Sequence, residues 1–395
     1  MKVFLRHLII ASIALVGSPV LAQDDCVQFR DKCVKQNRSM HFIDISSASD
    51  DLAGIEKLSR LKAVSLRGTS EESAQVDISA LSQLPELVDL SLKNVTLLTP
   101  EDLFDINVSR LTINGGATDL AVLGQLSGLE RLNLFDVNEN KKVNFGELAN
   151  LQSLTLVDTP IATPSDLSNL SKLQSLVLAN TGITDLSVIA DLDLTRLTLR
   201  GDGLRDLSPL GKMKTLEFLT LGGSEITSLD GLDLGENLRM LSAENSGLQD
   251  ISGLAGAINV KDVNLKGSQV VKLDGLENLA QLETLDARET PLNDISGLGA
   301  HPKLEQLWLS DTMVEDLSPL SGLSNLKMLT LSRMPAKDLS VLAELDNLEV
   351  LFLNETKATD LTPLLDMDAL EGIAFDGATV FGKENLAKFV EEFGK

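Results

Sequence analysis

One spacing of leucines recurs along most of this chain and constrains its fold more than any other feature. Leu304, Leu307 and Leu309 give the pattern L-x-x-L-x-L, and the pattern restarts at Leu326. Copies follow one another at intervals of 21 or 22 residues, with a single interval of 26. A repeat of this length indicates a solenoid, in which each unit stacks on the next. The units open at Met40 (a degenerate copy), Leu61, Leu87, Val108, Leu129, Leu151, Leu173, Leu194, Leu216, Leu238, Val260, Leu282, Leu304, Leu326, Leu348 and Leu370.

The spacing within one unit assigns its positions to two faces. The fourth and sixth positions lie two residues apart, so they point to the same side of a short strand, while the third, fifth and seventh point to the other. A single unit has too little apolar surface to offset the entropy of ordering its backbone, so units must share a core. We therefore expect an α/β fold: a solenoid curving as a right-handed superhelix, with a parallel sheet on its concave face and short helical or 3-10 turns on its convex face.

The segment that returns from one strand to the next carries two further patterns. A hydroxyl residue followed by proline predicts a capped helical turn, at Thr163, Ser208, Ser318 and Thr362. A carboxylate also recurs in one column of consecutive units, at Asp294, Asp316, Asp338 and Asp360. Stacked carboxylates can bind Ca²⁺. We expect instead that each accepts backbone N–H groups at its turn.

The unit L-x-x-L-x-L-x-x-T-x-I-x-D-L-S-x-L-x-x-L resembles the 22-residue leucine-rich repeat of bacterial internalins. It is also similar to the repeat of leucine-rich-repeat subunits that regulate phosphatases. The resemblance covers residues 61–380 and implies a protein-binding solenoid. This chain departs from the family at the ninth position, typically Asn, where it carries residues such as Thr159, Ser246 and Thr312. Because a hydroxyl has one donor where an amide has two, we expect fewer hydrogen bonds between units.

The first 22 residues are typical of a cleaved export signal. Lys2 and Arg6 precede an apolar run from Leu8 to Val16, and Ala22 ends a segment suited to signal peptidase. The alternative is a membrane anchor, but this run is shorter than a spanning helix. We expect a bacterial periplasmic or secreted protein with no membrane insertion after cleavage.

The two ends of the solenoid need caps to cover the last hydrophobic layers. Residues 23–60 are expected to form an N-terminal cap that contains the degenerate first unit. In an oxidising compartment Cys26 and Cys33 would form a disulfide there, which requires the chain to turn back as a hairpin. Two free thiols are the alternative. Residues 381–395 are expected to form a capping helix, and an amphipathic membrane helix is disfavoured by its glutamates. Its apolar face would carry Leu386, Phe389, Val390 and Phe393.

Side chains at the third, fifth and seventh positions are free of core packing and so are candidates for binding. One group combines Trp308, Phe352, Met328 and Val350, flanked by Arg288. A second pair is Phe218 and Met240, on neighbouring strands. Large apolar residues and arginine dominate interface energetics. The alternative is that they only pack against neighbouring strands.

Charge gives a third candidate on the same face. The formal net charge of −24 argues against nucleic acid and anionic membranes as general partners. Basic residues nevertheless line the N-terminal half of the concave sheet and favour an anionic partner, such as an acidic protein or a glycan. The alternative is a solvated face balanced by Asp89 and Asp136. The basic residues are Arg67, Lys93, Arg110, Arg131, Arg196 and Arg200.

The residue types argue against catalysis. Only His41 and His301 remain after signal cleavage, and the chain has no Gly-rich phosphate loop. We expect a monomeric, non-catalytic protein without cofactor or metal that binds a protein ligand on its concave face. The alternatives are a regulatory or structural subunit of an envelope enzyme complex and a glycan-binding, adhesin-like protein.

Overall fold

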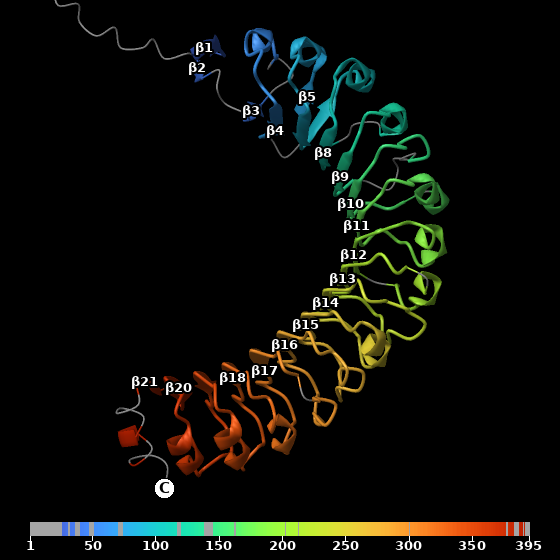
Figure 1. Ribbon diagram of the computed structural model, residues 1–395. Helices are drawn as coiled ribbons and strands as arrows, with labels where there is room; N and C mark the ends of the chain where they lie inside the picture. The colour runs from blue at the N-terminus through green and yellow to red at the C-terminus, as the bar shows by residue number, and fades with distance from the viewer. Residues whose placement is uncertain are drawn as a thin grey trace, which may run out of the picture.

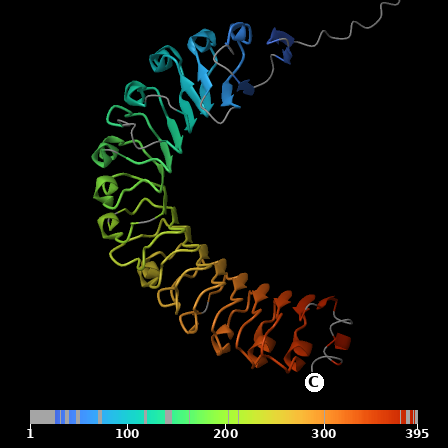
Figure 2. The same cartoon turned by 180° about the vertical axis from the view of Figure 1, so that it is seen from behind.

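The chain forms one continuous arc, with strands along its inner side and turns along its outer side (Figures 1 and 2). It therefore has the predicted leucine-rich-repeat solenoid fold. The computed structural model describes residues 26–30, 32–35, 40–46, 51–69, 74–116, 120–137, 145–161, 163–201, 203–211, 213–299, 301–376, 378–382, 387–389 and 391. The predicted export signal at residues 1–22 lies outside these ranges.

The inner side is a single sheet in which each unit contributes one strand. Neighbouring strands are parallel, and they pair at equivalent repeat positions, as Leu219 does with Leu241. The two ends of the sheet lie at opposite ends of the arc (Figure 1). The parallel strands are β3 (Met40–Ile45), β4 (Ala63–Gly68), β6 (Asp89–Lys93), β8 (Arg110–Asn114), β9 (Arg131–Phe135), β10 (Ser153–Val157), β11 (Ser175–Ala179), β12 (Arg196–Arg200), β13 (Phe218–Thr220), β14 (Met240–Ser242), β15 (Asp262–Asn264), β16 (Thr284–Asp286), β17 (Gln306–Trp308), β18 (Met328–Thr330), β19 (Val350–Phe352) and β20 (Gly372–Phe375).

The outer side carries short 3-10 helices, as the return segments predicted. Their predicted hydroxyl caps are wrong, because Thr163, Ser208, Ser318 and Thr362 make no capping hydrogen bond from their side chains. At three of these four turns the aspartate two residues earlier (Asp206, Asp316 or Asp360) accepts the backbone N–H instead. The helices are η1 (Ile55–Lys57), η2 (Ser79–Gln83), η3 (Pro100–Asp105), η4 (Ala121–Gln125), η5 (Pro164–Asn169), η6 (Leu186–Ile189), η7 (Ser208–Leu210), η8 (Ser252–Gly256), η9 (Ser318–Leu320), η10 (Ser340–Glu344) and η11 (Thr362–Asp366).

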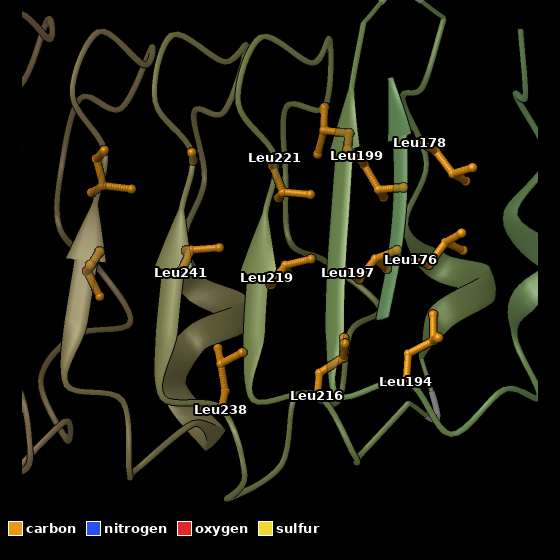
Figure 3. Close-up of a cluster of buried hydrophobic side chains, with 14 of the residues drawn as sticks. Leu176, Leu178, Leu194, Leu197, Leu199, Leu216, Leu219, Leu221, Leu238 and Leu241 are labelled. Carbon is orange, nitrogen blue, oxygen red and sulfur yellow. The ribbon is translucent and has the colours of Figure 1, made fainter. Parts of the chain in front are cut away.

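The core is a ladder of leucines that runs through the whole arc. Leu197, Leu219 and Leu241 occupy the fourth position of successive units, and all three are buried. Their side chains point to the same side of the sheet, in line with those of the first and sixth positions (Figure 3). Each layer thus covers the flank of the next, as the spacing of the leucines predicted.

Both ends depart from the regular repeat. At the N-terminal end, β1 (Cys26–Phe29) and β2 (Lys32–Lys35) form an antiparallel hairpin, so the chain reverses between the two cysteines. At the C-terminal end, β21 (Ala378–Phe381) pairs antiparallel with β20 and was not predicted. Phe389 follows in a helical segment and is buried edge-on against Phe375. The other apolar residues of the predicted capping helix lie outside the described residues.

The one long unit, between Leu61 and Leu87, contains an additional strand. β5 (Ala74–Val76) pairs in parallel with β7 (Val95–Leu97) of the following unit, forming a separate two-stranded sheet. The extra residues of this interval are therefore accommodated beside the main sheet and leave its register unchanged.

The eighth position of the unit has a left-handed backbone in much of the chain. Glycine, asparagine or aspartate occupies most of these positions, as at Asn180 (φ 52°), Gly223 (φ 67°) and Asp311 (φ 63°). These residue types adopt positive φ at little cost, whereas other side chains lose roughly 1–2 kcal/mol. Glu289, Arg333 and Glu355 nevertheless adopt it.

The ninth-position hydroxyls bond mainly within their own unit. Ser246 Oγ donates to the carbonyl of Ala243 at 2.7 Å, and Thr312 Oγ1 donates to that of Leu309 at 2.8 Å. Thr159 Oγ1 also accepts a longer bond of 3.4 Å from the N–H of Val137 in the preceding unit. The network between units is therefore sparse at this position, as the replacement of asparagine predicted.

Candidate functional site on the concave sheet

The side chains at alternate strand positions face the open trough of the arc. In β13, Leu219 is buried, while Phe218 and Thr220 on either side of it are partly exposed. Trp308 follows the same rule in β17: it is partly exposed between two buried leucines and does not enter the core. The sequence thus placed the candidate residues on the correct face.

Three of the predicted apolar residues line one hollow on strands β17 to β19. Trp308 and Phe352 lie in the fifth column, two strands apart, and Met328 belongs to the strand between them. The hollow has a volume of about 300 Å³. Val350, the fourth predicted residue, pairs with Met328 in the third column but lies outside the lining. Three of the four predicted apolar residues therefore share one hollow, and Val350 lies beside it.

Arg288, the predicted flanking cation, forms an ion pair with Asp286 that balances its charge. Its Nη2 lies 2.6 Å from Asp286 Oδ2, and its Nε donates to Asp286 Oδ1 at 2.9 Å. These hydrogen bonds raise the pKa of Arg288 above its usual range. The guanidinium carbon also lies 5.8 Å from the centre of the Trp308 ring. Arg288 is thus held beside the tryptophan by a carboxylate that the sequence analysis did not single out.

A second ion pair at the hollow was not predicted. Arg333 donates from Nε and Nη2 to the two carboxylate oxygens of Asp311, each at 2.5 Å. Both residues occupy the left-handed eighth position, and both line the hollow together with Glu289. Because both residues line the hollow, they join the candidate set. The glycine and asparagine that recur at the eighth position are the signal that sequence analysis missed.

The second apolar pair lies near the middle of the arc, on β13 and β14, where Phe218 pairs with Met240. Arg196 extends over the ring of Phe218, with its guanidinium carbon 4.6 Å from the ring centre. The structure therefore brings the predicted apolar pair together with one of the predicted basic residues.

The basic residues of the N-terminal half fall into two classes. Arg67 pairs with Asp44 at 2.8 Å, and Arg110 pairs with Asp89 at 3.1 Å. Within the described part of the chain, no carboxylate lies within ion-pair distance of the other four. Ion pairing within the sheet thus balances the charge of two of the six basic residues. The four without such a partner are Lys93, Arg131, Arg196 and Arg200.

The aspartate column caps the outer turns, as expected. Asp294, Asp316 and Asp338 each accept the backbone N–H two residues later, at 2.8–2.9 Å. For Asp316 this bond, followed by the hydroxyl of Ser318, lowers the pKa of the carboxyl. Among the described residues, no cluster of three His, Cys, Asp or Glu side chains is arranged to hold a metal ion.

Comparison with known proteins shows similarity in fold alone. No family model and no curated protein matches the sequence. Among solved structures, internalin InlF of Listeria monocytogenes is similar over 87% of this chain and 90% of its own, with 22% identity and a TM-score of 0.55. A leucine-rich-repeat protein of Leptospira interrogans is similar over 88% and 93%, with 20% identity and a TM-score of 0.60.

A third similar structure comes from outside the bacteria. Toll of Drosophila, solved in complex with Spätzle, is similar over 87% of this chain and 55% of its own, with 16% identity and a TM-score of 0.61. These similarities agree with an internalin-like leucine-rich-repeat architecture. In the described part of the chain, no helix has the length and apolar character needed to cross a membrane.

Proposed function

We propose that this leucine-rich-repeat protein is a non-catalytic, monomeric binding protein that recognises a protein ligand on its concave sheet. One observation carries the proposal: Trp308, Met328 and Phe352 gather around one hollow on the solvent side of the sheet. Many other strands carry serine or threonine in the fifth column instead. Exposing large apolar side chains to water is unfavourable, and their burial under a partner would release that cost.

The charges around the hollow support an apolar anchor from a protein. Arg288 and Arg333 are each paired with an aspartate, so the hollow offers little net charge to a small anion. A tryptophan with a neighbouring arginine is typical of the residues that dominate protein interfaces. Toll, which shares this fold, is a protein that was solved with a protein partner.

We also propose that the protein is exported, with residues 1–22 removed and Cys26 joined to Cys33. The hairpin of β1 and β2 supports the disulfide, since it brings the two cysteine-bearing strands side by side. In this proposal the hairpin and the first unit cap one end, and the segment after residue 380 caps the other. An intact mass that begins at Gln23 and lacks two hydrogens, measured on protein from the envelope or medium, is the expected result. A full-length chain with two alkylatable thiols in the cytosol would contradict it.

The binding site is tested by photo-crosslinking from inside the hollow. A benzoylphenylalanine at position 308 should capture a partner, whereas the same group at position 313 should not. Met313 is the matched control because it is 62% exposed in the same unit and does not line the hollow. Excess wild-type protein should compete for the partner, and the W308A/F352A variant should not.

The affinity of the captured partner then decides the proposal. Trp308→Ala should weaken binding by more than about thirtyfold, as expected of a central aromatic anchor worth about 2 kcal/mol or more. Equal labelling from positions 308 and 313, or an unchanged dissociation constant, would refute the site. A partner that is an envelope enzyme would instead favour the role of regulatory subunit.

A further inference from the structure

Two arginines on β12 are presented to the trough without a carboxylate partner among the described residues. Arg196 and Arg200 occupy the third and seventh positions of one unit, so both project from the concave face, and both are exposed. They are four residues apart on one strand, which places their Cα atoms about 13 Å from each other. An extended ligand strand has the same rise per residue, so acidic residues four apart in it match this separation.

Each guanidinium lies against a residue of the next unit. That of Arg196 stacks on the ring of Phe218 at 4.6 Å. That of Arg200 lies over Gly222, where an added Cβ would lie 3.6 Å from both its Nε and its Nη2. Stacking on the ring positions the planar guanidinium of Arg196 in advance, so it loses less entropy when it binds a carboxylate with two parallel hydrogen bonds.

Arg200 also forms one wall of a hollow of about 420 Å³. Gly223 also lines this hollow and is exposed, so the backbone is open to a ligand at this residue. Glu244 on the opposite wall disfavours a carboxylate near itself, which restricts an acidic group to the side of β12. The apolar surface of Phe218 and Met240 adjoins Arg196 in the same column, on the next two strands.

From this arrangement we propose that β12 to β14 form a second site that takes an extended acidic segment of a protein ligand. Two carboxylates of the segment would contact Arg196 and Arg200, and an apolar side chain near them would rest on Phe218 and Met240. The inference rests on the proposed function only in placing the ligand on the concave sheet. It uses strands other than those of the Trp308 hollow.

The surroundings favour a protein segment over a sulfated polysaccharide. A polysaccharide carries negative charge along its whole length, and beyond Arg200 it would meet Glu244 and Asp262 in the following units. The chain's net charge of −24 repels such a polymer further. A protein segment can place acidic residues over β12 and other residues elsewhere.

A display library of random peptides, screened on the full exported chain, tests the proposal. Peptides enriched on the wild type should carry pairs of Asp or Glu together with an apolar residue. A synthesised, fluorescein-labelled winner should bind about tenfold more weakly for each of the changes Arg196→Gln and Arg200→Gln. Its affinity should fall as NaCl rises from about 0.05 to about 0.5 M. The R196K/R200K variant keeps the positive charges but loses the planar guanidinium groups, so its affinity for the peptide should lie between those of the wild type and the glutamine variants.

Two controls separate this site from general charge and from the other hollow. Arg110→Gln removes one positive charge from the column that contains Arg196. Because Arg110 is already paired with Asp89, this change should leave the affinity for the peptide unchanged. Trp308→Ala should also leave peptide binding unchanged, so that failure of the Trp308 site is seen separately. Absence of acidic enrichment, an unchanged R196Q/R200Q affinity, an equal loss in Arg110→Gln, or tighter binding of a heparin oligosaccharide would each overturn the proposal.

Discussion

His301 lies where its neighbouring units carry leucine, and its replacement by leucine should stabilise the protein most in weak acid. Leu279 and Leu323 occupy the same column 22 residues before and after it, and all three side chains are buried. His301 Nδ1 lies 3.2 Å from the carbonyl of Leu279 and donates to it. Its Nε2 has no hydrogen-bond partner among the described residues, so the ring carries a desolvated lone pair into the core.

The size of the effect has a constant part and a part that depends on pH. A buried acceptor without a partner costs about 1–3 kcal/mol, which His301→Leu removes at neutral pH. Burial lowers the pKa of His301, so the folded protein binds a proton less readily than the unfolded chain. The stability held by the neutral ring is therefore complete above the unfolded pKa of about 6.5 and declines as pH falls below it. For one proton the decline is at most about 1.4 kcal/mol per pH unit.

Urea unfolding at several values between pH 7.5 and pH 5, followed by circular dichroism, measures both parts. The difference between His301→Leu and wild type should be positive at pH 7.5 and grow toward pH 5. His301→Gln separates the two causes, because it keeps a buried polar group but cannot titrate, so its own stability should vary less with pH. Equal pH dependence in wild type and both variants would show that His301 is not held neutral in the core.

Four further substitutions test the repeat itself. Leu241→Ala should cost about 2–5 kcal/mol in urea unfolding, because its side chain is fully buried between two units; a loss below about 1 kcal/mol would mean that the layers are not closely packed. Glu355→Gly should gain up to about 1 kcal/mol by relieving its positive φ, while Gly223→Ala, with open space around its Cβ, should lose a similar amount; opposite signs would contradict the backbone explanation. Asp316→Asn should lower the melting temperature at pH 7 and reduce the loss of stability as pH falls through the lowered pKa of Asp316; an acid titration identical to wild type would exclude the cap.

The sheet was predictable because its information is repeated in every unit. Leu219 and Leu241 stand at one position of a regular interval, so their shared face and the parallel pairing follow from spacing alone. The same alternation placed Trp308 on the solvent side. β21 could not be predicted in this way, because its pairing with β20 is antiparallel and breaks the repeat.

Contacts between side chains were less predictable, because they depend on rotamers and on local backbone. Asp286 accepts hydrogen bonds from Arg288, which lies two residues later on the same face of the sheet. The repeat pattern places both side chains on this face but does not determine whether they pair. The left-handed eighth position did leave a trace in the sequence, since Asn180 and its equivalents are mostly glycine, asparagine or aspartate. Arg333 departs from this preference: it adopts a positive φ although it is none of these residue types, and it forms an ion pair beside the hollow.

The separation of charge along the sheet limits what kind of ligand could use both proposed sites. The arginines around the Trp308 hollow are paired with aspartates, whereas Arg196 and Arg200 on β12 have no such partner among the described residues. Five strand spacings separate β12 from β17, about 24 Å along the sheet. A ligand that reaches both must therefore present an acidic group and an apolar group at that distance, which a folded protein surface does and a small molecule does not. Linking two moderate contacts across a rigid arc also raises affinity without requiring either site to be strong.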